Sequence, residues 1–210
     1  MASRIIFAWT RLGHTDGLFP ELDEFYHGEF MEVIAEALLP VIRSYAREIY
    51  TQAALEVGFP PEFTPDLEEF IRGYVSVASV QHAKTSRQEL QSLVSNLDIT
   101  EELNALELKL AEWLEKRAQR MAKRQTTEGN GAFSKFAYIA GGVASLRWVT
   151  AGSATCPFCK KLNGRSVLGA ETFLQAGTAL ESDEGKLRVS RNVNHPPAHP
   201  GCDCFISPGI

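Results

Sequence analysis

Apolar side chains follow a helical period through most of the first 140 residues. From His27 to about Val57 they recur at three- and four-residue steps, which is the spacing of one helix face. Pro40 falls inside this run and is expected to kink or interrupt the helix, because proline has no backbone N–H to donate. Gly58 and the Phe-Pro-Pro that follows it end the run. The pattern predicts helix over residues 27–57, with a kink or break at Pro40.

A second helical pattern begins at Thr64, where a hydroxyl N-cap precedes Pro65 at the first helical position. Its apolar face extends to Ala78 and can be followed to Val94. A break near residues 84–86 is an alternative to one continuous helix.

A third helix is predicted to start at the Asp-Ile-Thr-Glu capping box of residues 98–101. A leucine-rich stripe follows to Met121, and the helix is expected to end in a basic run. The run comprises Lys116, Arg117, Arg120, Lys123 and Arg124. A helix macrodipole favours cations at its C-terminal end, so a solvated helix end is the simplest interpretation, and a contact with acidic protein or DNA is the alternative. Residues 129–131, Gly-Asn-Gly, indicate a loop, and a short helical piece is expected to follow it to about residue 142.

The pattern changes near residue 143, where the helical period stops. Residues 1–26 show no clear period and are expected to form an irregular arm. We therefore predict two parts: residues 1–142 form a helical region with an irregular N-terminal arm, and residues 143–210 form a small β-rich module. The predicted fold class is α+β.

The C-terminal module contains all four cysteines, in two close pairs, with a histidine beside the second pair. These five candidate metal ligands are Cys156, Cys159, His199, Cys202 and Cys204. Residues 146–150 are expected to form a strand, and residues 165–168 its partner across the Asn163-Gly164 turn. The first cysteine pair would then lie near the tip of a strand-turn-strand unit.

Zinc binds four thiolates or imidazoles in a tetrahedron. Cys156, Cys159 and two of the other three candidates complete such a site, and the spacing does not choose among them. We therefore expect one structural Zn²⁺ per chain. Buried free thiols are the simplest alternative.

A thiol-disulfide enzyme is the other alternative, because the Cys-Pro-Phe-Cys of residues 156–159 resembles a glutaredoxin active site. In such a site a helix N-terminus stabilises the first thiolate. Only residues 160–162 separate the motif from the Asn163-Gly164 turn, which is expected to leave no room for a stable helix. His195 precedes two prolines and is expected to be a loop residue, not a ligand.

Charge and hydropathy narrow the function classes. The 210 residues carry a net charge of −5, which disfavours a general nucleic-acid binder, because such proteins need a basic surface. No apolar run is long enough for a transmembrane helix, and the N-terminus lacks the features of a signal peptide. We expect a protein that is made and kept in a reducing cytosol, where thiols persist.

The sequence motifs of the C-terminal module resemble the signature of the Mu F-like head morphogenesis proteins of tailed bacteriophages. The matching segments are residues 148–152, 156–159, 162–167 and 196–204. Asn163 stands where the family has aspartate in the turn, and Asp203 stands where it has arginine between the last cysteines. The resemblance covers roughly residues 140–206.

The resemblance implies a minor head protein that associates with the portal protein and the major capsid protein during assembly. It implies a place in the virion head after synthesis in the bacterial host cytoplasm, and no catalysis. Nucleic acid is not an expected partner, apart from packaged DNA nearby. The alternatives are an enzyme, either the glutaredoxin-like thiol exchanger or a toxin-type transferase, and an internal head protein that contacts DNA through the basic run.

Overall fold

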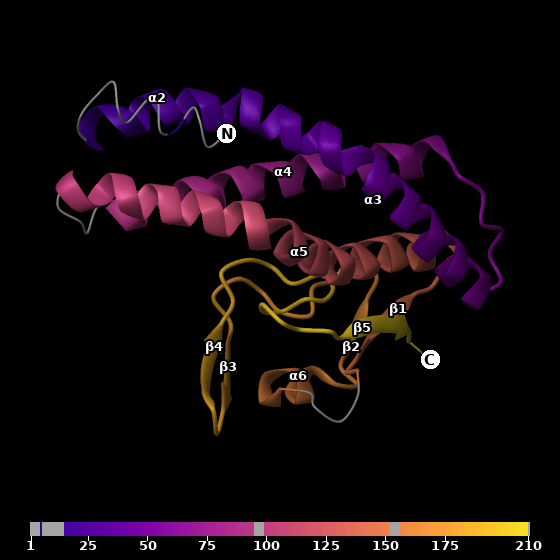
Figure 1. The fold of residues 1–210 in the computed structure, drawn as a ribbon. Coiled ribbons are helices and arrows are strands. Elements are labelled where there is room, and N and C mark those ends of the chain that lie inside the picture. The colour runs from indigo at the N-terminus through magenta and orange to yellow at the C-terminus, as the bar shows by residue number, and fades with distance from the viewer. Residues whose placement is uncertain (1–4, 6–14, 95–98, 152–155, 210) are drawn as a thin grey trace. The chain divides into compact units, whose positions relative to one another are not determined.

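A computed structural model describes residues 5, 15–94, 99–151 and 156–209 (Figure 1). Long helices come first in the chain and short antiparallel strands follow, so the fold is α+β, as the sequence predicted. The helices are α2 (Thr15–His27), α3 (Glu29–Glu56), α4 (Pro65–Val94), α5 (Ile99–Ala140) and α6 (Pro157–Leu162). The strands are β1 (Ser145–Val149), β2 (Ser166–Leu168), β3 (Ala179–Ser182), β4 (Gly185–Arg188) and β5 (Phe205–Pro208). None of the helices in these described ranges is both long and apolar enough to cross a membrane.

The chain divides into two compact units, each assembled from two stretches of sequence. The first unit draws on Met1–Arg43 and Glu68–Arg120, and the second on Ser44–Leu67 and Met121–Ile210. The second unit therefore extends across residue 143 and combines helical residues with the strands. The change from helix to strand still occurs near residue 143, because α5 ends at Ala140 and β1 begins at Ser145.

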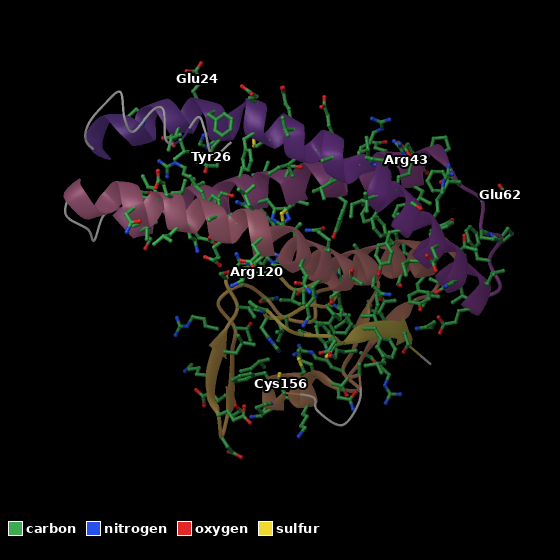
Figure 2. All side chains as sticks on the ribbon, viewed as in Figure 1. Glu24, Tyr26, Arg43, Glu62, Arg120 and Cys156 are labelled. Atoms are coloured by element: carbon green, nitrogen blue, oxygen red, sulfur yellow. The ribbon has the colours of Figure 1, made fainter. Side chains whose placement is uncertain are left out.

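The first unit has a core of buried apolar side chains contributed by α2, α3, α4 and α5 (Figure 2). Tyr26 and Phe30 lie edge to face at its centre, with ring centroids 5.1 Å apart. Trp113 is buried in the same cluster, and the Arg117 guanidinium lies 4.4 Å from its ring centroid, a cation–π distance. An ion pair between Arg87 and Asp23 joins α4 to α2.

Residues 15–26 are helical, so the expectation of an irregular arm was wrong for them. Leu22, Tyr26 and Phe30 recur every four residues and are all buried in the first unit's core. Pro20 lies within α2 and obscured this period in the sequence. The rest of the expected arm, apart from Ile5, lies outside the described residues.

The helices α3 and α4 follow their predicted boundaries closely. The α3 helix ends with Gly58 in the left-handed region at φ +71°, and the Phe59 and Gly58 amides donate to the carbonyls of Ala54 and Leu55. This is the Schellman pattern of a helix C-terminus. Thr64 Oγ1 accepts a hydrogen bond from the Leu67 amide at 3.3 Å, which confirms the predicted N-cap of α4.

Neither helix breaks where the sequence suggested a break. Pro40 lies inside α3, and α4 continues through residues 84–86. Ser86 Oγ donates a hydrogen bond to the His82 carbonyl one turn earlier. The hydroxyl therefore has a partner within α4 and does not favour a non-helical backbone at this position.

The α5 helix runs for 42 residues, so the predicted loop at residues 129–131 was wrong. These glycines allow close packing against the helix instead. A Cβ on Gly131 would lie 2.6 Å from the Pro196 carbonyl oxygen and 2.7 Å from His195 Nδ1. Asp98, the first residue of the predicted capping box, lies outside the described residues.

The basic run consequently lies in the middle of α5 and not at its end. The macrodipole acts only within the last turn of a helix, so it does not explain these cations. Two of them have carboxylate partners on the same helix: Arg120 Nη1 lies 3.1 Å from a Glu112 oxygen, and Arg124 Nε lies 3.3 Å from a Glu128 oxygen.

A three-stranded antiparallel sheet with the order β2-β1-β5 forms the centre of the second unit. In its register Leu146 opposes Val167 and Trp148 opposes Ile206, and these four side chains are buried on one face. The predicted strand at residues 146–150 and its partner after the turn are therefore confirmed. The strands β3 and β4 form a separate antiparallel hairpin.

Candidate metal centre

Strand pairing brings the two cysteine pairs together. The β1 strand pairs on one side with β2 and on the other with β5. The first pair follows β1, with Cys159 inside α6, and Cys204 immediately precedes β5. Segments about 40 residues apart in the chain therefore meet beside one strand, as the 43-residue separation of Cys159 and Cys202 illustrates.

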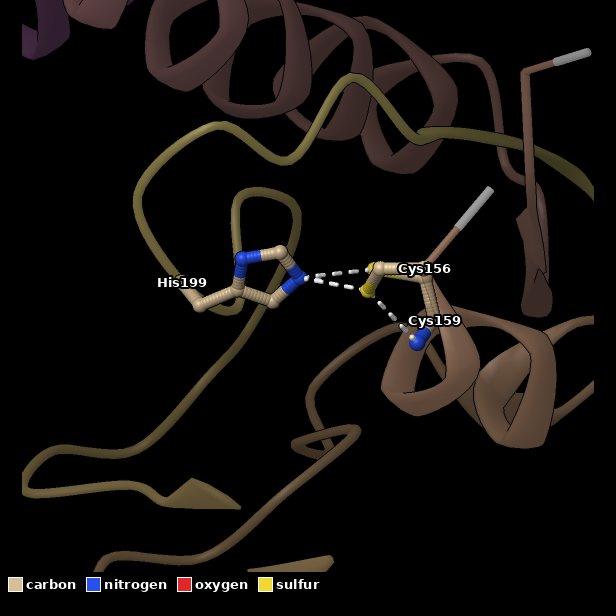
Figure 3. Close-up of side chains that lie close together, drawn as sticks. All are labelled: Cys156, Cys159 and His199. Carbon is tan, nitrogen blue, oxygen red and sulfur yellow. Dashed lines mark hydrogen bonds between the residues drawn. The ribbon is translucent and has the colours of Figure 1, made fainter. Parts of the chain in front are cut away.

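The sulfur and imidazole atoms of all five predicted ligands form two groups that share Cys159. One group is Cys156, Cys159 and His199, the other is Cys159, Cys202 and Cys204, and the ligand atoms within each lie within 4.8 Å of one another. His199 Nε2 lies 3.0 Å from Cys156 Sγ and 3.1 Å from Cys159 Sγ (Figure 3). The Sγ atoms of Cys159 and Cys202 are 3.6 Å apart. A tetrahedral zinc site separates neighbouring sulfurs by about 3.8 Å and a sulfur and nitrogen by about 3.6 Å, so these spacings are compatible with a metal site.

His199 presents the correct nitrogen to the thiols. Its Nδ1 lies 2.8 Å from the Pro200 carbonyl oxygen, which can only accept a hydrogen bond, so Nδ1 carries the proton. The lone pair of Nε2 then points at Cys156 and Cys159. A histidine that binds a metal usually donates its other N–H in this way, which fixes its tautomer and ring orientation. The Phe158 ring packs edge-on against the imidazole, with centroids 6.4 Å apart.

A short helix follows Cys156, contrary to the expectation that the sequence leaves no room for one. The α6 helix has six residues, with Pro157 in its first turn and Cys159 and Leu162 buried. Cys156 is its N-cap, and its sulfur accepts a hydrogen bond from the Cys159 amide at 3.4 Å. Burial of two side chains and the cap offset the small number of backbone hydrogen bonds, so tertiary packing stabilises a helix that is too short to form alone.

Three of the thiols are buried and share hydrogen bonds. Cys159, Cys202 and Cys204 are each at most 5% exposed. The hydrogen bonds from Cys159 and then Cys204 lower the pKa of Cys202, and the bond to Cys202 raises the pKa of Cys159. A bound cation would favour ionisation of these thiols, since metals bind cysteine as thiolate.

Trp148 contributes to the cluster in a way that the sequence did not reveal. Its side chain is fully buried, and its indole N–H has no partner of hydrogen-bond geometry among the described residues. It lies near Cys204. The hydrogen bond to Cys159 lowers the pKa of Cys204, but the bond to Cys202 and burial outweigh it and the pKa is raised; the Trp148 N–H makes only a small opposing contribution. An N–H group beside sulfur stabilises a thiolate, whether free or bound to a metal. The position of Trp148 one residue from the end of β1 was the only sequence signal for this role.

His195 lies outside both ligand groups, as expected for a loop residue. Its Nδ1 lies 2.6 Å from the Pro196 carbonyl oxygen, and burial lowers its pKa. It packs where Gly131 leaves space on α5.

Comparison of the sequence with protein-family models and curated proteins, and of the structure with solved structures, finds no match. The resemblance to the Mu F-like family therefore rests on the motif residues alone and stays a prediction.

Proposed function

We propose that this chain is a structural assembly protein of a tailed-phage head, built around one zinc ion per chain. The observation that carries the proposal is the convergence of Cys156, Cys159, His199, Cys202 and Cys204 from two distant segments. The same residues carry the resemblance to the Mu F-like motif.

Zinc is the metal that fits this donor set, because thiolates and imidazole in a tetrahedron are its usual ligands. The centre has Cys156 and Cys159 with two of the other three residues as its ligands. Four protein ligands leave no position for water or substrate, which is the condition of a structural site. The binding free energy then contributes directly to folding of the second unit.

A thiol-disulfide enzyme is the second candidate, because Cys156 is the N-cap of α6 and is less buried than the other cysteines. The second cysteine pair weighs against it. Cys159 Sγ lies 3.6 Å from Cys202 Sγ, and Cys159, Cys202 and Cys204 form one ligand group. A redox pair does not need these two further cysteines.

The assembly role draws further support from exposed apolar side chains on the helices. Val41 is 64% exposed on α3 and Leu114 is 81% exposed on α5. Such residues are available for contact with protein partners, for which the portal protein and the major capsid protein are our proposals.

Elemental analysis of protein purified without chelator tests the metal, and we expect one zinc per chain. Cys159→Ser should lose the metal and destabilise the second unit, because both ligand groups depend on this sulfur. Lys160→Ser, an exposed change in the next residue of α6, should leave zinc content and stability unchanged. A folded, metal-free protein that reduces disulfides through Cys156 would instead identify a thiol enzyme.

Co-expression with a portal protein and a major capsid protein from the same phage tests the assembly role. We expect the chain to remain with purified heads at about 0.5 M salt, where exposed ion pairs are screened. Its absence from heads would reject the assembly role without bearing on the metal.

A further inference from the structure

A groove of about 380 Å³ lies within the second unit, between α3, α5 and the segment that leads into β5. Tyr45, Gln52 and Glu56 line it from α3, at seven- and four-residue steps along one helix face. Asn130, Ser134 and Tyr138 line it from α5, at four-residue steps. The segment Asp203–Ile206 forms the third wall. We call this feature the α3–β5 groove.

The α3–β5 groove is acidic. Glu56 and Asp203 are exposed carboxylates in its lining, and none of the described residues that line it is a lysine, arginine or histidine. Glu56 Oε2 accepts a hydrogen bond from the Tyr138 hydroxyl at 2.7 Å. A carboxylate accepts several hydrogen bonds, so Glu56 keeps acceptor capacity while it holds Tyr138.

Apolar side chains form the floor of the same groove. Ile49, Ala53 and Ile206 are buried there, and the Phe205 ring is 40% exposed at the edge. Hydrogen bonding fixes part of the wall, because the Tyr45 hydroxyl donates to the Thr126 carbonyl at 2.9 Å. The groove is therefore partly preorganised, and it combines an apolar floor with acceptors at its rim.

An arginine side chain matches this combination better than other cationic groups. Its aliphatic stem suits the floor, and its guanidinium can bind a carboxylate through two parallel hydrogen bonds. The planar guanidinium also stacks on aromatic rings such as Phe205, which the compact, strongly hydrated ammonium of lysine does less well. We propose that the α3–β5 groove binds an arginine side chain presented by a protein partner. The inference stands on the chemistry of the groove and holds whether or not the chain assembles into phage heads.

Chemical-shift titration of the isotope-labelled, metal-loaded full chain tests the proposal. The probe is an acetylated heptapeptide with one central arginine between leucines, compared with the same peptide carrying citrulline or lysine. We expect saturable shifts for the side-chain amides of Gln52 and Asn130 and the backbone amide of Phe205. Citrulline, which lacks the charge, should remove the shifts, and lysine should weaken them.

Two isosteric variants locate the site. Glu56→Gln and Asp203→Asn should each weaken arginine-peptide binding by about 3- to 5-fold, the value of a partly exposed ion pair. Glu184→Gln removes the same charge at the tip of the β3–β4 hairpin and should leave affinity unchanged. Unchanged zinc content in Asp203→Asn shows that the neighbouring cysteines are intact.

The outcomes that overturn the proposal are equally specific. The first is the absence of saturable shifts up to about 10 mM peptide, since an affinity weaker than that is too low for recognition. The second is equal binding of the citrulline or lysine peptide. The third is a set of shifts confined to other surfaces. Equal weakening by Glu184→Gln would show that only the overall charge matters.

Discussion

Cys159 connects the two halves of the cysteine cluster, since its sulfur belongs to both ligand groups. The sequence was sufficient to name it and the other four candidates, because close Cys and His spacing is a local signal. It could not show that one sulfur would be shared, or that Trp148 would lie beside Cys204. Both facts depend on how β1 pairs with β5, which is a long-range contact that no local spacing encodes.

A Gly131→Ala variant tests how closely the loop at Pro196 packs against α5. Alanine normally stabilises a helix relative to glycine by about 0.5–1 kcal/mol. At Gly131 the added carbon would meet the Pro196 carbonyl oxygen at 2.6 Å. We therefore expect Gly131→Ala to destabilise the protein by about 1–3 kcal/mol, the usual cost of overpacking.

Gly73 provides the control, because it lies in α4 and a Cβ there meets nothing within 4 Å. Gly73→Ala should stabilise by about 0.5–1 kcal/mol. Urea unfolding of both variants measures the difference. Equal stabilisation by the two changes would show that the loop at Pro196 does not approach α5 this closely.

Among the elements, α3, α4 and the first part of α5 were predictable, whereas the continuity of α5 through residues 129–131 and the whole of α6 were not, for related reasons. Periodicity and caps determine α3 and α4, and both signals are local. Glycines at 129 and 131 lower the helix propensity of α5, but they permit close packing that only the folded chain contains. Likewise, α6 depends on burial of Cys159 and Leu162 against parts of the chain distant in sequence.

Glu128 joins α5 to the segment before His195 through an ion pair whose strength depends on pH. Its carboxylate is 8% exposed, with Arg191 Nη2 at 2.5 Å and Arg124 Nε at 3.3 Å. Burial alone would raise the pKa of Glu128, but the hydrogen bond and charge of Arg191, with the charge of Arg124, outweigh it and the pKa is lowered. A lowered carboxyl pKa contributes stability above its ordinary value and loses it as pH falls through the folded value.

We therefore expect Glu128→Gln to cost about 1–2 kcal/mol at pH 7, where the charged hydrogen bonds are complete. The difference from the unmodified chain should shrink as pH falls below about 4.3, the ordinary glutamate pKa. Urea unfolding at pH 7 and at lower pH measures it, with the exposed Glu184→Gln as control. A difference that is constant with pH would contradict this role.

At the scale of the whole molecule, the fold class was predictable and the division into units was not. The loss of helical period near residue 143 correctly located the change to strands. Each unit, however, combines stretches separated by tens of residues, such as Ser44–Leu67 with the chain beyond Met121. Amphipathic patterns show which face of a helix is buried but not which distant segment covers it.

The proposed metal centre would hold together two segments of the chain that are otherwise linked only through the β3–β4 hairpin and strand pairing. The first cysteine pair and residues 199–204 bracket the β3–β4 hairpin, whose tip contains the exposed Glu184. The pairing of β1 with β5 joins the chain on either side of that tip, and the proposed zinc would join it again. The peptide bonds at the tip are then not required to keep the two sides in place.

A split protein tests this consequence. We expect that a protease site inserted between Asp183 and Glu184 can be cut without separating the fragments, which should elute together in gel filtration. The C-terminal fragment keeps its pairing with β1 and its Arg191–Glu128 ion pair. We expect a chelator to release it, because these contacts are too few to hold so short a piece without the metal. Fragments that separate before chelation would show that the metal does not join the halves. If they stay together until the metal is removed, the chain could be expressed as two halves that assemble around one ion.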